Sequence, residues 1–278
     1  MFESLFKTKH IIYECPPRTA YPSHSVIAAG WNSRPGCALI GRVEDGKPLL
    51  LNVNNQPHVL IAGSSGSGKS SLMHGIINSL IFSTAALNPR FAFIDIKRVE
   101  YSPYNKKSFP LDLYEHPARN INEAKTILQN ISDLIENRYK TLERNNQNFF
   151  QGQPVYLFID ELADLVIGHK DVLNQIIHIG QIGRAANVHV IAATQVPSRS
   201  VIPTLLQVNL PCHIALRVSS PIESRIILGT SGAEKLKNPG DMIIKSVTGC
   251  VTYGHADYYS RADVNRLIAA LRTKTEYR

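Results

Sequence analysis

The segment GSSGSGKS, residues 63–70, constrains the fold of this chain more than any other stretch. It has the spacing G-x-x-x-x-G-K-[ST], it follows the apolar run HVLIAG (58–63), and it precedes a segment with helical character (71–87). Glycines allow a tight turn whose backbone N–H groups point at phosphate oxygens, and the start of a helix adds its positive dipole end. The pattern therefore predicts a phosphate-binding loop between a strand and a helix, and a merely flexible Ser/Gly-rich loop would not need these flanks. The expected nucleotide contacts come from Gly63, Ser64, Ser65, Gly66, Ser67, Gly68, Lys69, Ser70 and Ser71.

Two residues of this loop have distinct chemistry, and a second motif complements them. Lys69 is expected to reach the β- and γ-phosphates of ATP, and Ser70 to offer its hydroxyl to Mg²⁺. In VYLFIDE (155–161) an apolar strand ends in Asp160 and Glu161, which is a Walker B pattern. Asp160 is expected to hold the Mg²⁺ ion opposite Ser70, and Glu161 to act as the general base for water. The alternative is an acidic turn that faces solvent.

Two further candidates flank a later strand, VHVIAAT (188–194). Gln195 follows this strand next to Thr194, where a polar side chain can touch both the γ-phosphate and the attacking water. We therefore expect Gln195 to act as a sensor of the γ-phosphate. Arg184 precedes the strand and is a candidate for stabilising the charge of phosphoryl transfer, either within the subunit or across a subunit boundary. The alternatives are a strand cap for Gln195 and a surface ion pair for Arg184.

Strands and helices alternate along most of the chain, which predicts an α/β fold. Buried strands are expected at 91–96, 155–160, 188–194 and 212–218, and a long amphipathic helix at 121–143. Such alternation indicates a mostly parallel central sheet with helices on both faces and with the ligand at the carboxyl ends of the strands. We divide the chain into a partly β N-terminal extension (1–50), with two short strands within 38–53, and an ATPase domain (51–278).

Composition limits the partners and the compartment. The chain has 278 residues with a net charge of +8, and this excess of positive charge favours a polyanionic partner such as nucleic acid. Its 4 cysteines are scattered, which suggests free thiols in a reducing compartment. Neither an apolar run of membrane-spanning length nor a signal peptide is recognisable, so we expect a cytoplasmic protein.

Taken in order, these segments resemble the FtsK/SpoIIIE family of motor ATPases from about residue 39 to 272. QPHVLIAGSSGSGKSSLMHG is similar to the phosphate-binding segment of that family, and FIDELADL (158–165) to its Walker B segment. FAFIDIKRVEYSPY (91–104) resembles its second strand, in which Asp-x-Lys follows apolar residues. IGRAANVHVIAATQVPS resembles its R-A-x-G-I-H and A-T-Q-R-P segments.

The resemblance implies a RecA-like core that assembles as a homo-oligomeric ring, usually a hexamer, and moves double-stranded DNA. One subunit would supply Lys69, Ser70, Asp160, Glu161 and Gln195, and its neighbour would supply Arg184 as an arginine finger. Three positions that are basic in the family are not basic here: Val196, Gln207 and Pro221. A basic pore lining would grip phosphates, and for this chain we expect the DNA contacts from Arg225, Lys235 and Lys237.

Two regions that are not recognisable in the sequence shape the expected role. Chromosome translocases carry a membrane-spanning region and a winged-helix module, and neither is recognisable here. We therefore expect a relative from a plasmid, a conjugative element or a phage that handles DNA transfer. A partner in the membrane complex would then recruit the protein. Two alternatives stay open: a protein-secretion motor of the type VII kind, and an ATP-dependent docking factor that recruits a relaxase or a replication protein.

Overall fold

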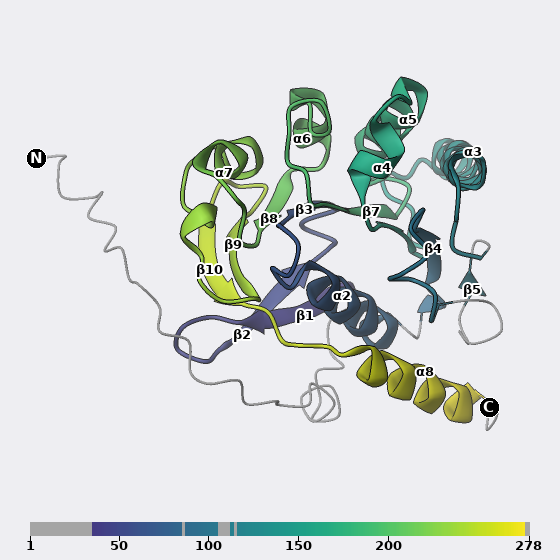
Figure 1. The fold of residues 1–278 in the computed structure, drawn as a ribbon. Coiled ribbons are helices and arrows are strands. Elements are labelled where there is room, and N and C mark those ends of the chain that lie inside the picture. Colours follow the sequence, from purple (N-terminus) through teal and green to yellow (C-terminus); the bar gives the residue numbers. More distant parts are fainter. Residues whose placement is uncertain (1–34, 85–86, 105–111, 114–115, 276–278) are drawn as a thin grey trace, which may run out of the picture.

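A computed structural model describes residues 35–84, 87–104, 112–113 and 116–275 (Figure 1). Within these residues the strands form a single sheet in the order β2-β1-β10-β9-β8-β3-β7-β6-β4-β5. The strands are β1 (Cys37–Arg42), β2 (Pro48–Asn52), β3 (His58–Ala62), β4 (Arg90–Ile94), β5 (Asp112–Leu113), β6 (Val155–Ile159), β7 (Val188–Thr194), β8 (Cys212–Ala215), β9 (Asp241–Lys245) and β10 (Val251–His255). Residues 1–34, most of the expected N-terminal extension, lie outside the described residues.

One half of the sheet is parallel and the other half is antiparallel. From β8 to β5 all neighbouring strands are parallel, with β3 between β8 and β7 at the centre. Strands β9, β10, β1 and β2 continue the sheet through antiparallel pairs. The mixed α/β fold with a mostly parallel central sheet is therefore confirmed.

Helices cover both faces of this sheet. In Figure 1, α2 and α8 lie on one side, and α3 to α7 lie on the other. The helices are α2 (Lys69–Ser83), α3 (Ile121–Asn145), α4 (Leu162–Val166), α5 (Lys170–Ile182), α6 (Thr204–Asn209), α7 (Pro221–Leu228) and α8 (Arg261–Thr275), with a short 3₁₀ helix, η2 (Ala233–Lys235). Helices α4 and α6, with 5 and 6 residues, were not expected from the sequence because they are too short for a clear periodicity.

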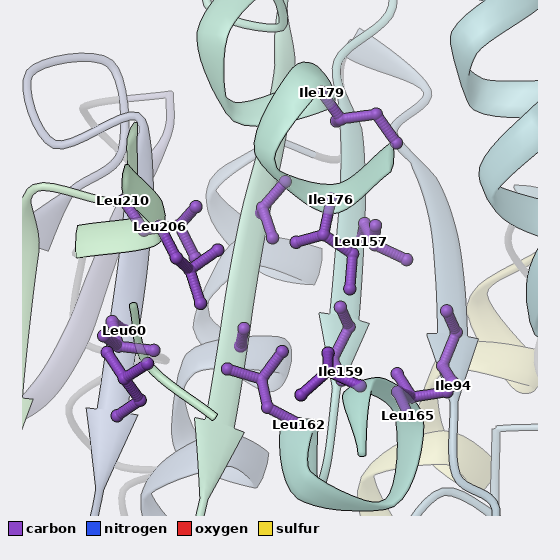
Figure 2. Packing of buried hydrophobic residues seen from close by; sticks show 14 of the residues in the cluster. Leu60, Ile94, Leu157, Ile159, Leu162, Leu165, Ile176, Ile179, Leu206 and Leu210 are labelled. Carbon is purple, nitrogen blue, oxygen red and sulfur yellow. The ribbon is translucent and has the colours of Figure 1, made fainter. Parts of the chain in front are cut away.

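Alternating side chains of the central strands build the two halves of the core. Leu60 in β3 and Leu157 in β6 belong to the cluster beneath α4, α5 and α6, which Figure 2 shows in close-up. Their neighbours in sequence, Ile61 and Phe158, point to the opposite face and join the cluster beneath α2 and α8. Because side chains alternate along a strand, an uninterrupted apolar run is what a strand covered on both faces requires.

Local signals set the ends of the longest helix. Asn120 caps α3 by accepting a hydrogen bond from Glu123 N at 3.0 Å, and the Glu123 carboxylate in turn accepts one from Arg119 N at 2.7 Å. Asn146 ends the helix in the left-handed region with φ of 52°. This reciprocal capping places the start of α3 where its apolar stripe begins.

The expected N-terminal strand pair forms the hairpin β1–β2, in which β1 pairs with β10 and β2 is the edge strand of the sheet. A division of the chain at residue 50 would fall within β2. That division stays a prediction, and the hairpin continues the same sheet as the rest of the described chain. Among the described residues, no helix is both long and apolar enough to cross a membrane.

Candidate active site

The phosphate-binding loop joins β3 to α2 at the carboxyl end of the parallel strands. Three glycines shape it in different ways. A Cβ atom at Gly63 would collide with Ser67 Oγ, and one at Gly68, whose φ is +98°, would lie 2.8 Å from Gly240 N. Gly66 has φ of +75° but nothing within 4 Å of its notional Cβ, so this side of the loop is open. Gly63 and Gly68 are therefore required by packing, and Gly66 only by backbone conformation.

Neighbouring strand ends hold the loop in place. Ser64 N donates to Arg217 O at 2.9 Å, and Gly240 N donates to Ser67 O at 2.8 Å. The Ser64 hydroxyl lies 3.0 Å from that of Ser219. The Ser67 hydroxyl is buried and has no hydrogen-bond partner among the described residues. These hydrogen bonds hold the loop backbone through the protein's own groups, which is the preorganisation that a phosphate cradle needs.

Two other serines of the loop differ in their surroundings. Ser65 is exposed, as the sequence prediction of a phosphate contact requires. The Ser71 hydroxyl is already engaged, because it donates to Asp257 O at 3.2 Å and accepts from Tyr259 N at 2.6 Å. A nucleotide contact from Ser71 would therefore come from its backbone N–H rather than from its side chain.

Lys69 pairs with Asp160 in the interior. Lys69 Nζ donates to the Asp160 backbone oxygen at 2.9 Å and to Asp160 Oδ1 at 3.3 Å. Both residues are only 5% exposed. Burial raises the pKa of the Asp160 carboxyl, although the Lys69 ammonium beside it acts in the opposite direction. The two motifs that the sequence predicts to meet at the nucleotide therefore contact each other directly.

Glu161 is held by three donors from two elements. Its Oε1 accepts from the Thr194 hydroxyl at 2.5 Å and from Ala163 N at 3.2 Å, so that it also caps α4. Its Oε2 accepts from Gln195 N at 2.8 Å. The carboxylate is 5% exposed. The end of β7 thus fixes the orientation of the carboxylate that the sequence predicts to be the general base, and the Gln195 residue next to it is exposed.

The segment after β4 brings a residue to this site that sequence reasoning missed. Arg98, with φ of 61°, makes a tight turn whose N–H donates to Asp95 O at 3.0 Å. The buried Asp95 carboxylate accepts from Tyr101 N at 2.9 Å. This turn places Glu100 over the start of α2, where it accepts a hydrogen bond from the Ser70 hydroxyl at 2.8 Å. No sequence signal marks this turn, since it depends on a non-glycine residue with positive φ.

Arg184 lies apart from the other predicted catalytic residues. It is exposed and precedes β7, whereas Gln195 follows it. The 7 residues of β7 span about 23 Å at roughly 3.3 Å per residue. Arg184 instead lies near the amino end of β3, where burial, His189 and the Arg184 charge lower the pKa of His58 to about 3. Arg184 cannot reach the phosphate-binding loop of its own chain across this distance.

The predicted DNA-contacting residues are all exposed. Arg225 lies on α7, Lys235 ends η2, and Lys237 follows two residues later. Two of the three positions at which the resemblance implies a basic residue expose other side chains: Val196 is 49% exposed and Pro221 begins α7. Gln207 is half-buried and donates to Ile202 O at 3.1 Å.

The residues of the site fit ATP and Mg²⁺. The open side of the loop at Gly66 and the start of the 15-residue helix α2 suit phosphate groups. Ser70 and Asp160 provide hard oxygen donors of the kind Mg²⁺ prefers. In the described part of the chain no group of 3 or more His, Cys, Asp or Glu residues is arranged to hold a metal by itself.

The fold and the site together define a P-loop ATPase motor domain. Residues 27–153 match the FtsK/SpoIIIE family. DNA translocase FtsK from Streptococcus pneumoniae is 35% identical over 258 residues, which is 85% of this chain and 33% of that protein. The chain belongs to the FtsK/SpoIIIE family, and it spans about a third of the length of the curated relatives it matches.

Solved structures give the same fold. The conjugation coupling protein TcpA of pCW3 in its monomer form with ATPγS superposes with a TM-score of 0.74 at 20% identity, over 86% of this chain and 71% of that chain. The cytoplasmic domain of the type VII secretion ATPase EccC from Thermomonospora curvata also has a TM-score of 0.74, at 22% identity, over 88% of this chain and 32% of that chain.

Proposed function

We propose that the chain is the ATP-hydrolysing subunit of a ring motor that translocates DNA, with each active site formed between two subunits. The observation that carries this proposal is the separation along β7, a strand about 23 Å long: Glu161 is fixed at its carboxyl end, and the exposed Arg184 precedes its amino end. An arginine so placed can serve phosphoryl transfer only in another subunit. Family membership supports both the motor and DNA as its substrate.

Within this site each residue of the chain has a task. The loop backbone and Lys69 bind the phosphates. Ser70 and Asp160 would hold a Mg²⁺ ion, which would supply positive charge to the phosphates. Glu161 accepts a proton from the attacking water, and Gln195 beside it contacts the γ-phosphate. Arg184 of one subunit stabilises the transition-state charge in the site of the next. We further propose that the ring is a hexamer and that it acts in plasmid, conjugative or phage DNA transfer.

A dilution series tests the shared site. ATPase activity per subunit should fall steeply as the protein is diluted below the concentration at which it assembles, because a monomer has no arginine in its site. Arg184→Ala should bind ATP normally and lose on the order of 10³–10⁵ in rate, whereas the exposed control Arg144→Ala should match the parent. Activity per subunit that stays constant down to fully monomeric protein would refute the shared site and the ring.

A second assay tests the substrate. Duplex DNA should stimulate the ATPase, and Arg225→Ala should reduce the slope of log affinity against log salt by about 1, since one phosphate contact is lost. The exposed, uncharged Val196 favours one alternative, a motor or docking factor that acts on protein. Absence of stimulation by duplex or single-stranded DNA in an assembled, active ring would favour that alternative and reject DNA as the substrate.

A further inference from the structure

The Ser70 hydroxyl donates its proton to a carboxylate that is distant in the sequence. On α3, Thr126, Ser132 and Thr141 each donate to the backbone carbonyl four residues earlier, at 2.9–3.1 Å. This is the usual local bond of a helical serine or threonine. Ser70 lies in the first turn of α2 and donates instead to Glu100 Oε1 at 2.8 Å, a residue 30 positions away in the chain. Ser70 is the second residue of α2, so the residue four positions earlier lies outside the helix, and Glu100 takes the place of the local acceptor.

A chain of contacts holds Glu100 in this position. His74 follows Ser70 by one helical turn on the same face of α2, and its Nε2 lies 3.7 Å from Glu100 Oε2. On its other side, His74 Nδ1 lies 2.9 Å from the Tyr104 hydroxyl. His74 and Tyr104 are buried, and the Glu100 side chain is only 28% exposed. Both oxygens of Glu100 thus face α2, one toward Ser70 and one toward His74.

The chemistry of a hydroxyl gives this arrangement a purpose. A serine hydroxyl has one proton to donate and two lone pairs to offer. When a lone pair binds a cation, the proton has to point away and needs an acceptor. Glu100 is that acceptor. Because the Ser70 hydroxyl directs its proton at Glu100, its lone pairs face away from Glu100.

We propose that Glu100 is a positioning residue for Mg²⁺: it orients the Ser70 hydroxyl so that its oxygen is ready to bind the ion that accompanies the nucleotide. His74 and Tyr104 hold Glu100 for this purpose. The inference rests on the proposed nucleotide site and adds to it a residue that contacts the Mg²⁺ ligand Ser70. Groups that orient a metal ligand in this way typically change metal affinity by about 10–100-fold when they are removed.

The test is a Mg²⁺ titration of binding to a fluorescent ADP analogue, which needs no hydrolysis. Glu100→Met removes the acceptor at similar length, and Glu100→Gln keeps an acceptor oxygen without the charge. The Mg²⁺ midpoint is the Mg²⁺ concentration that gives half of the full Mg²⁺-dependent change in binding of the analogue. We expect Glu100→Met to raise this midpoint about 10-fold or more, and to leave ADP affinity in EDTA unchanged. Glu100→Gln should stay close to the parent. Thermal unfolding in EDTA checks each variant, and Glu100→Ala replaces Glu100→Met if the latter does not fold.

Two controls separate positioning from other roles. Arg261→Ala removes the hydrogen bond from Arg261 Nη2 to Ser102 Oγ, which anchors the same segment elsewhere, and it should not change the Mg²⁺ midpoint. In a Ser70→Ala background, Glu100→Met should have no further effect, because Glu100 acts through that hydroxyl.

The inference fails if Glu100→Met leaves the Mg²⁺ midpoint unchanged, or if its effect is equally large in the Ser70→Ala background. It also fails if Glu100→Gln is as damaging as Glu100→Met, since the charge and not the acceptor would then matter. If the parent protein does not bind the ADP analogue at all, the nucleotide site itself is wrong, which is a separate outcome.

Discussion

Replacing Lys69 should weaken the nucleotide-free fold as well as nucleotide binding. From the sequence, Lys69 is expected to face the phosphates, so that Lys69→Ala would leave the fold intact. In the structure its ammonium is buried and donates twice to Asp160, which is equally buried. Lys69→Ala would leave the Asp160 carboxylate in the interior without its counter-charge. Breaking a buried ion pair in this way typically costs about 3–5 kcal/mol.

The uptake of a proton by Asp160 limits this cost. Protonating an aspartate whose ordinary pKa is 3.8 costs about 5 kcal/mol at pH 7.5 and about 2 kcal/mol at pH 5.5, at roughly 1.36 kcal/mol per pH unit. The pKa of Asp160 is already raised in the folded protein, and removal of Lys69 raises it further. A carboxyl with a raised pKa destabilises the fold increasingly as pH rises. The loss of stability in Lys69→Ala should therefore be larger at pH 7.5 than at pH 5.5.

Denaturant unfolding in EDTA without nucleotide measures the effect at both pH values. The double variant Lys69→Ala/Asp160→Asn should recover most of the lost stability, because a neutral amide needs no counter-charge, and the exposed Lys140→Ala should resemble the parent. The reasoning is refuted if Lys69→Ala unfolds at the parent's midpoint at pH 7.5. It is also refuted if the double variant is no more stable than Lys69→Ala alone.

Four further substitutions probe the phosphate-binding loop, the Glu161 carboxylate and the amino end of β3. Gly66→Ala should fold with a loss of about 1 kcal/mol, whereas Gly68→Ala should lose considerably more because its Cβ meets backbone at 2.8 Å; thermal unfolding that gives equal losses would contradict the loop geometry. Thr194→Val removes one hydrogen bond to Glu161 and should lower the turnover number while ADP affinity stays unchanged; a parent-like rate would show that Thr194 does not orient the carboxylate. His58, with its pKa lowered to about 3, stays neutral in the fold while the unfolded chain takes up a proton below pH 6.5, so stability falls as pH falls. His58→Gln should remove about 1.4 kcal/mol of the stability difference between pH 7.5 and pH 5.5, measured by denaturant unfolding, and an unchanged difference would exclude His58 as its source.

The sequence predicts the architecture because its patterns are local. Uninterrupted apolar runs identify β3, β4, β6 and β7, and the glycine spacing identifies the loop after β3. Parallel strands place their carboxyl ends at one edge, so Lys69, Asp160 and Gln195 could be expected together. The prediction needed no knowledge of which strands are neighbours.

The contacts within the site depend on register and turns, which no local pattern reveals. Strand β6 pairs with β7 so that Ile159 lies opposite Ala192. Glu161 lies two residues after Ile159, and Thr194 lies two residues after Ala192. This register therefore brings Glu161 beside Thr194, and a shift by one residue would separate them. Glu100 reaches Ser70 only through the turn at Arg98. Both findings require long-range geometry.

Strand β7 has a particular place in the proposed ring. All 7 of its residues are buried, and it hydrogen-bonds to β3 on one side and β6 on the other. At its carboxyl end Thr194 fixes the Glu161 carboxylate, and its carbonyl accepts from Gly63 N at 3.2 Å, so the strand contacts both the base and the phosphate loop. At its amino end stands Arg184, which the proposal assigns to the neighbouring subunit's site. A close-packed strand held on both sides has little room to bend. Under the proposed function, β7 and the turn that precedes it therefore connect the base of one active site to the arginine of the next.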